Sequence, residues 1–199
     1  MSQDASLISK GFAICVGGVP GAGKTTLLRA HVEREIRDMQ VTGSSIVKSI
    51  IAPSSVNDLD GWTLERRQAV REQSIHELRK IRTQSAGRLL VDGHFTLRNR
   101  ATRLLESIFT PEDKEFFQAL VLIHPSPDLV IAQRKHDGRV RSTESIDEIS
   151  THIDAELLAA RQLSRDMGVP LLELVESGLP QRLEVMAEFL EKFAPLAAK

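Results

Sequence analysis

The chain has 199 residues, of which 41% are hydrophobic and 27% are charged, and its formal net charge is −1. This composition is typical of a globular protein with its own core, and the near-zero charge argues against nucleic acid as the main partner. The single cysteine excludes an intramolecular disulfide. The sequence has neither a leader-like N-terminus nor a long apolar run, so we expect a cytoplasmic protein. Its length predicts one domain over residues 1–199.

Apolar runs that end in glycine or an acid predict buried strands, and apolar residues at helical spacing predict helices between them. The segments 110–113 and 126–128 each place a proline after a capping residue, which marks the start of a helix. In chain order we expect a strand over 12–16, a helix over 24–38, a strand over 46–51, a helix over 63–85, a strand over 89–91, a helix over 97–109, a short helix from 110, a strand over 119–123, a helix over 126–135, a helix over 145–167, a strand over 171–175 and a helix over 180–193. This alternation predicts an α/β fold with a parallel sheet covered on both faces.

A glycine-rich segment lies between the first expected strand and the first expected helix. Gly18 and Gly23 are separated by four residues and followed by Lys24 and Thr25, which matches the P-loop pattern. In such a loop, backbone N–H groups converge on phosphate oxygens, the lysine reaches the β- and γ-phosphates, and the hydroxyl binds Mg²⁺. We therefore expect MgATP to bind here, with Thr26 donating to the α-phosphate. The expected nucleotide-binding residues of the loop are Gly18, Pro20, Gly21, Ala22, Gly23, Lys24, Thr25 and Thr26.

An acid and a histidine follow the third expected strand. Asp92 ends this strand, and His94 lies two residues later. An acid at this point is expected to be the second magnesium-side group, together with Thr25. Both side chains would lie at the carboxyl edge of the sheet, where α/β proteins bind ligands. The histidines show no metal-ligand spacing with cysteine, so we expect Mg²⁺ and no zinc.

Four arginines surround or follow a polar break in the last third of the chain. Arg134, Arg139 and Arg141 lie in or beside this break, and Arg161 lies on the next expected helix. Arginines aimed at a transferring phosphoryl group stabilise its charge, and a closed lid that carries them excludes water. We therefore expect a short lid at about 134–143.

These motifs together resemble the archaeal-type adenylate kinases and the related nuclear adenylate kinase isoenzymes, which are P-loop nucleoside monophosphate kinases. The resemblance rests on the P-loop, on Asp92-Gly93-His94, and on Arg139-Val140-Arg141 with Arg161 downstream. It implies that Arg134 lies against adenine and that His94 orients the phosphate or a water. The expected fold is a five-stranded parallel sheet in the order 2-3-1-4-5, flanked by helices. The residues that the resemblance assigns to phosphates and magnesium are Lys24, Thr25, Asp92, Arg139, Arg141 and Arg161.

The acceptor side departs from that family. Its members carry an arginine shortly before the long helix that follows the second strand, and this chain has Trp62 and Thr63 there. Trp62 either stacks on a base or fills the core. We expect the acceptor-binding segment at about 44–71. The candidate cations of the acceptor site are Lys48, Arg66, Arg67 and Arg71.

Three functions stay open from the sequence. The first is a nucleoside monophosphate kinase that transfers the γ-phosphoryl of MgATP to AMP or dAMP. The second is a P-loop kinase of another small acceptor, such as a nucleoside, a sugar or a nucleotide sugar, which the missing arginine favours. The third is a slow ATPase that acts as a switch or assembly factor, an activity that the resemblance at His94 suggests.

Overall fold

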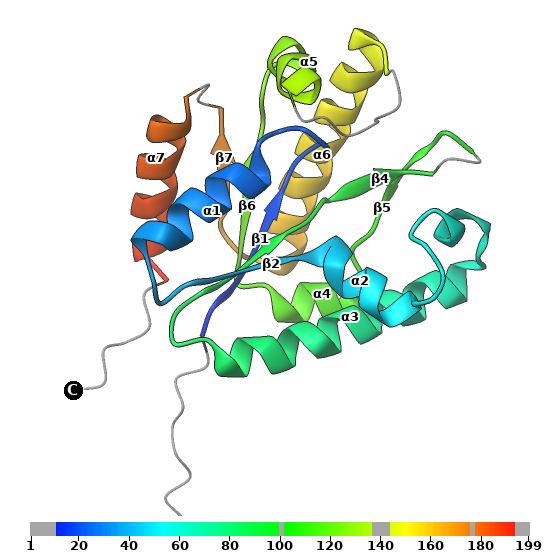
Figure 1. Cartoon of the computed structure of the whole chain (residues 1–199), viewed down its shortest axis with the longest axis horizontal. Coiled ribbons are helices and arrows are strands. Elements are labelled where there is room, and N and C mark those ends of the chain that lie inside the picture. The colour runs from blue at the N-terminus through cyan, green and yellow to red at the C-terminus, as the bar shows by residue number, and fades with distance from the viewer. Residues whose placement is uncertain (1–10, 100–101, 137–143, 176–177, 194–199) are drawn as a thin grey trace, which may run out of the picture.

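The computed structural model describes residues 11–99, 102–136, 144–175 and 178–193. Five parallel strands form the central sheet, in the order β2-β3-β1-β6-β7 (Figure 1). The predicted order 2-3-1-4-5 is therefore confirmed. The strands of this sheet are β1 (Ala13–Gly17), β2 (Met39–Thr42), β3 (Leu89–Asp92), β6 (Ala119–Ile123) and β7 (Leu171–Leu174).

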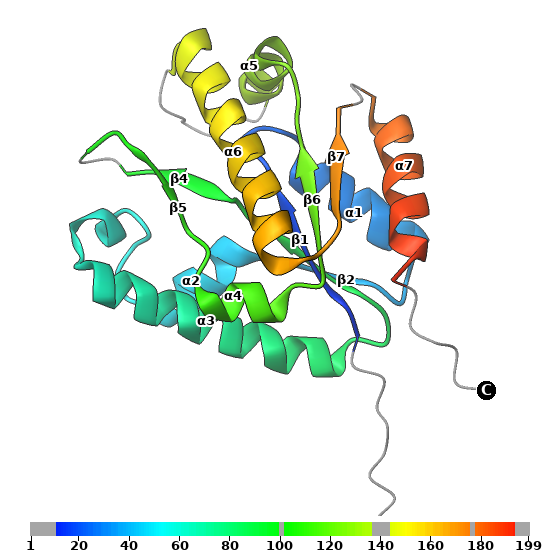
Figure 2. The ribbon, with the colours of Figure 1, turned by 180° about the vertical axis from the view of Figure 1, so that it is seen from behind.

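Helices cover both faces of the sheet. Figures 1 and 2 show α1 and α7 on one face and α3, α4 and α6 on the other. Within the described ranges, no helix is long and apolar enough to cross a bilayer. The helices are α1 (Lys24–Arg34), α2 (Gly43–Ile51), α3 (Leu64–Gln84), α4 (Pro111–Phe116), α5 (Pro127–His136), α6 (Ile146–Met167) and α7 (Leu179–Glu191), with a 3₁₀ turn at Asp58–Gly61.

The alternation of side chains along β1 divides the core into two clusters. Ile14 and Val16 pack in the cluster that includes residues of α1 and α7, whereas Ala13 and Cys15 pack in the cluster on the opposite face. Successive side chains of a strand point to opposite faces, so a fully buried strand must be apolar at every position. The Phe95 ring packs directly against Gly17, where a larger side chain would overlap it.

The second strand does not lie at 46–51, where we predicted it. Helix α2 occupies that segment, and β2 precedes it at the edge of the sheet. Ile46 and Ile50 are four residues apart and therefore lie on one side of the helix. A short apolar run cannot be assigned to a strand or a helix by its pattern alone, which explains the error.

The helix predicted over 97–109 is also wrong. The chain forms the antiparallel strands β4 (Thr96–Arg98) and β5 (Leu105–Ser107) instead. The backbone N–H of Asn99 donates to the Leu104 carbonyl at 2.9 Å and closes the pair. Phe95 and Phe109 flank this hairpin, and their rings meet at a centroid distance of 5.6 Å. The packing of these two rings at the base of the hairpin therefore favours the hairpin over the helix that the spacing of the leucines predicts.

Candidate functional site

The loop after β1 has the backbone geometry of a phosphate cradle. Gly18 has a φ of 140° and Gly21 a φ of 90°, conformations that favour glycine. A Cβ on Gly18 would lie 2.7 Å from the Ile123 carbonyl oxygen, so the loop passes close to the neighbouring strand β6. Helix α1 begins at Lys24, directly after the loop. The loop and the N-terminus of α1 together present backbone N–H groups to an anion.

Lys24 is buried and lies against the loop that it follows. Its Nζ donates to the carbonyl oxygens of Gly18 at 2.6 Å and Val19 at 3.1 Å. Only 6% of the residue is exposed. Because a buried ammonium must have compensating partners, these contacts stabilise the charge inside the loop. The ammonium is therefore placed to bind phosphate oxygens.

Thr25 and Asp92 meet at the carboxyl edge of the sheet. The Thr25 hydroxyl donates to Oδ2 of Asp92 at 2.6 Å. The register explains this contact, since Asp92 pairs with Val16 of β1 and with Thr42 of β2. A hydroxyl and a carboxylate side by side fit Mg²⁺, which takes few protein ligands and completes its shell with phosphate oxygens and water. Among the described residues, no three His, Cys, Asp or Glu side chains form a metal site.

His94 lies next to this pair, on the segment that leads from β3 to β4. Burial lowers its pKa well below the ordinary value, and the charge of Lys24 lowers it further. Its Nδ1 is buried and has no hydrogen-bond partner within the described ranges. His94 is therefore neutral at physiological pH, and one ring nitrogen is available for a ligand or a water.

Glu156 of α6 binds the segment that carries His94. Its carboxylate accepts from the Thr96 backbone N–H at 2.8 Å, the Thr96 hydroxyl at 2.9 Å and the Phe95 N–H at 3.2 Å. The residue is 1% exposed, and burial raises its pKa. Glu156 is thus a buried support for the loop that carries His94. Sequence reasoning missed it, because a single acid on a long helix gives no local signal.

A second missed residue, Arg182, supports the P-loop from α7. Its Nη1 donates to the Ala22 carbonyl at 3.2 Å, and only 4% of the residue is exposed. The two partners are 160 residues apart in the chain. Arginines are rarely buried, so this one is unusual. Neither its burial nor its partner can be read from the sequence.

Arg134 lies over the P-loop. The Nε of Arg134 donates to the Pro20 carbonyl at 2.9 Å, and its Nη1 donates to Glu144 at 2.7 Å. Arg139 and Arg141 lie outside the described residues. The predicted contact of Arg134 with adenine stays a prediction.

The structure does not bring Arg161 to the P-loop. Its guanidinium makes two hydrogen bonds to Glu173 of β7, at 2.7 and 2.8 Å, and its side chain is 48% exposed. Arg161 is thus paired with the carboxylate of Glu173. The phosphate-binding role that the resemblance assigns to Arg161 therefore stays a prediction.

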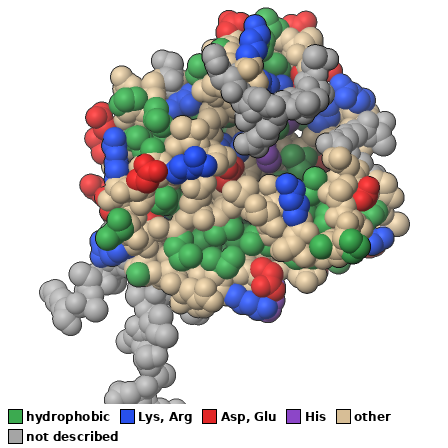
Figure 3. All heavy atoms as spheres, in the orientation of Figure 1, with side chains coloured by type: hydrophobic (Ala, Val, Ile, Leu, Met, Phe, Trp, Pro, Cys, Tyr) green, Lys and Arg blue, Asp and Glu red, His purple; other side chains and the backbone are tan. Residues whose placement is uncertain are grey.

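A cavity of about 470 Å³ opens beside Asp92 and His94. In Figure 3 a histidine side chain is visible inside a hollow near the centre of this face, with hydrophobic side chains around it. Arg67 and Arg71, two of the candidate cations of the acceptor site, line the cavity. Apolar side chains of α2, α3 and the β4–β5 hairpin form much of its wall; they include Val47, Leu64, Val70, Leu97, Ile108 and Phe109.

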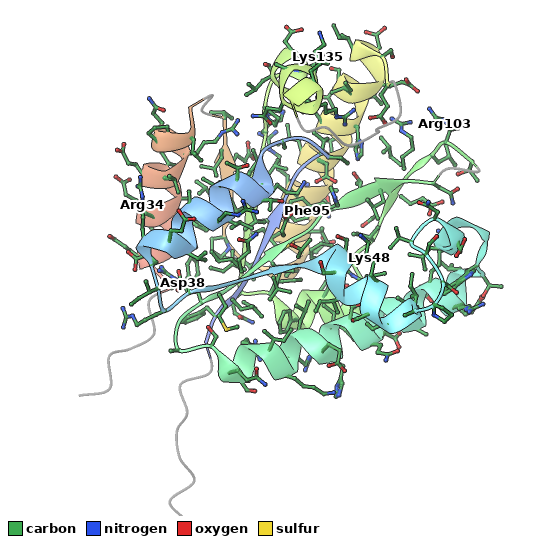
Figure 4. The ribbon with its side chains drawn as sticks, in the orientation of Figure 1. Arg34, Asp38, Lys48, Phe95, Arg103 and Lys135 are labelled. Carbon is green, nitrogen blue, oxygen red and sulfur yellow. The ribbon has the colours of Figure 1, made fainter. Side chains whose placement is uncertain are left out.

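The other two candidate cations of the acceptor side do not line this cavity. Lys48 is exposed on α2, as Figure 4 shows. The guanidinium of Arg66 stacks on the Trp62 ring, 3.5 Å from its centroid. Trp62 lies outside both core clusters and does not line this cavity, so a role in the core is not supported and stacking on a base stays a prediction.

Comparisons with known proteins agree with this geometry. Residues 17–150 match a protein-family model described as AAA domain. The adenylate kinase of Thermococcus sibiricus is 25% identical over 198 residues, which cover 94% of this chain and 96% of that protein, so the expected similarity to archaeal adenylate kinases is confirmed.

Solved structures share the fold at low sequence identity. A deoxyadenosine kinase from M. mycoides with bound dATP has a TM-score of 0.56 and 13% identity, covering 90% of this chain and 100% of that one. A sugar kinase from Janibacter sp. HTCC2649 has a TM-score of 0.58 and 15% identity, covering 95% and 99% of the two chains.

Proposed function

Because the chain belongs to the AAA domain family, we propose that it is an ATP-dependent phosphotransferase that binds ATP at its P-loop. It acts as a nucleoside monophosphate kinase on AMP or dAMP. One observation carries this proposal: the P-loop and the cavity share a carboxylate. Asp92 accepts from Thr25 at 2.6 Å and also lines the cavity. A donor in the loop and an acceptor in the cavity would therefore bring their phosphates together at Asp92. The adenylate kinase of Thermococcus sibiricus supports the choice of acceptor.

Each residue of the site has a distinct task in this reaction. Lys24 and the loop N–H groups would bind the β- and γ-phosphates, and Thr25 and Asp92 would hold Mg²⁺, which would neutralise phosphate charge. Arg67 and Arg71 of α3 line the cavity and would bind the acceptor phosphate. An oxygen of that phosphate attacks the γ-phosphorus, the bond from this phosphorus to the β–γ bridging oxygen breaks, and ADP leaves. No covalent enzyme intermediate is needed, so catalysis comes from positioning and charge stabilisation.

A second candidate function is phosphorylation of an acceptor without a phosphate. Three arginines line the cavity, and the charge of each is already compensated. Arg67 pairs with Glu106 at 3.0 Å, Arg71 with Asp113 at 2.6 Å and Arg98 with Glu144 at 3.5 Å. Much of the cavity wall is apolar, which also suits a nucleoside. The monophosphate kinase remains our first proposal because a bidentate arginine keeps further N–H groups for a second anion.

The deciding experiment is a turnover assay with the purified protein. MgATP is supplied alone, with each common ribo- and deoxynucleoside monophosphate, and with adenosine or deoxyadenosine, and the products are separated by anion-exchange chromatography. We expect AMP or dAMP to yield the matching diphosphate faster than ADP forms without an acceptor. Products from nucleosides alone would establish the second candidate. ADP release that no acceptor accelerates would contradict both and would indicate a slow ATPase. A cytoplasmic location and an arginine lid over 134–143 stay predictions.

A further inference from the structure

The N-terminus of α4 contains a carboxylate whose burial exceeds what a helix cap needs. Asp113 is the third residue of α4, and its side chain completes a capping box with Thr110. The side chain is completely buried, with 0% exposed. A capping residue at this position is ordinarily near solvent, and burial of a carboxylate costs more than a cap contributes. The burial of Asp113 therefore requires another explanation.

Arg71 of α3 supplies the compensating charge. Asp113 Oδ1 accepts from Nη2 of Arg71 at 2.6 Å, and Oδ2 accepts from Nε at 3.0 Å. Oδ2 also accepts from the backbone N–H and the hydroxyl of Thr110, each at 2.9 Å. The carboxylate thus has four donors around it, and the arginine cannot rotate without breaking two bonds. A bidentate pair of this kind fixes the plane of a guanidinium as well as its position.

The fixed guanidinium faces the acceptor cavity. Arg71 and Thr110 both line it, together with Asp92 and His94. Two of the five N–H donors of Arg71 are used on Asp113, which leaves three for a ligand. Two other arginines line the cavity and are held less firmly: Arg67 pairs through Nη1 with the partly exposed Glu106, and Arg98 lies 3.5 Å from Glu144.

We propose that Asp113 is a positioning residue that holds Arg71 with its remaining N–H groups directed at the anionic phosphate of the acceptor. This inference rests on the proposed function, because it assigns the acceptor phosphate to one guanidinium. The sequence signal at Thr110-Pro111-Glu112-Asp113 predicted only a helix start. Two of these residues, Thr110 and Asp113, also connect the start of α4 to the cavity, because Thr110 lines it and Asp113 binds Arg71.

The test compares Asp113→Asn with a matched control on the same helix. Glu115→Gln removes an acid of α4 that also pairs with an α3 arginine, Arg79, but at the surface, at 3.7 Å and with 76% of the Glu115 side chain exposed. For Asp113→Asn we expect the KM for AMP or dAMP to rise about 10- to 100-fold, since a small displacement of a positioning group has effects of this size. The KM for ATP should stay within about twofold, because no donor-side contact changes. Glu115→Gln should leave both constants unchanged.

Thermal melting of each variant separates positioning from folding. If Asp113→Asn does not fold, Arg71→Lys replaces it, because lysine keeps the charge beside Asp113 but lacks the planar fork. An unchanged acceptor KM in a folded variant, or equal rises in both KM values, would overturn this inference alone. A wild-type protein that binds ATP but neither AMP nor dAMP in calorimetry would overturn the inference together with the proposed function.

Discussion

Lys24 carries its charge inside the protein, at the point where the P-loop becomes a helix. Its contacts include two carbonyl oxygens of the loop. The ammonium thus lies in the phosphate loop and not among apolar side chains, so we expect its loss to leave the packing of the core intact. Its charge matters where the phosphates bind.

We therefore expect Lys24→Ala to fold and to lose phosphoryl transfer. Removing one preorganised charge of this kind lowers kcat by about 10²–10³-fold or more. Steady-state kinetics would measure the loss, and circular dichroism would show a melting curve close to that of the wild type. Arg29→Ala, an exposed cation on the same helix, is the control and should be fully active. An unfolded Lys24→Ala protein would refute our account of the loop.

At the scale of secondary structure, the edge strand β2 depends on a buried cluster at its amino end. Asp38 accepts from Arg88 through Nε at 3.0 and 2.9 Å, pairs with its Nη2 at 2.8 Å and contacts the His31 ring at 2.8 Å. Its backbone partner, the Arg88 N–H, is at 2.9 Å. Figure 4 labels Asp38 at the start of β2, away from the hairpin tip that carries Arg103. These contacts lower the pKa of Asp38 against the opposing effect of burial, which is the largest single influence.

Asp38→Ala should destabilise the fold by about 3–5 kcal/mol, because it leaves the buried Arg88 without its carboxylate. Urea unfolding would measure this loss, with Glu33→Ala as an exposed acidic control on α1. Residual folded protein should keep its kcat, since Asp38 precedes β2 and the active site follows the carboxyl ends of the strands. A lower kcat in fully folded Asp38→Ala protein would show that this end of the sheet affects catalysis.

The elements that sequence predicted well are those whose signals are local. The P-loop and Asp92 were predicted because each is marked by adjacent residues, and the sheet order followed from the family resemblance. The segments 46–51 and 97–109 were assigned wrongly because their apolar spacing fits two structures, and packing decides between them. The Arg71–Asp113 pair joins residues 42 positions apart, so no local pattern could reveal it.

At the scale of the whole molecule, buried histidines connect the site to the stability of the fold. Burial lowers the pKa of both His94 and His152, so both are neutral when the protein is folded. The charged groups that influence the pKa of His152 are Glu144, Arg98 and Arg134. In the unfolded chain both histidines titrate near the ordinary value, so the unfolded state binds more protons below about pH 6.5. Glu156 has the opposite effect on the pH dependence of stability. Burial raises its pKa, so the folded state keeps its proton at a higher pH than the unfolded state does.

Acidification from about pH 7 to 5.5 should therefore reduce the free energy of unfolding, by up to about 1.4 kcal/mol per pH unit for each histidine. His152→Leu should flatten this dependence in urea titrations at the two pH values. His76→Gln, at an exposed position of α3, should leave it unchanged. An identical pH slope in His152→Leu and wild type would contradict a neutral His152.

The bond from Arg182 to the Ala22 carbonyl has a consequence for how the chain can be shortened. The region that matches the family model stops at residue 150, before β7 and α7. A fragment cut there would retain every residue of the P-loop yet lose the guanidinium beneath it, together with the Leu183, Met186 and Leu190 side chains that pack in the adjacent core. We therefore expect the segment that matches the family model to be insufficient for nucleotide binding in this protein, because the last helix supports the P-loop.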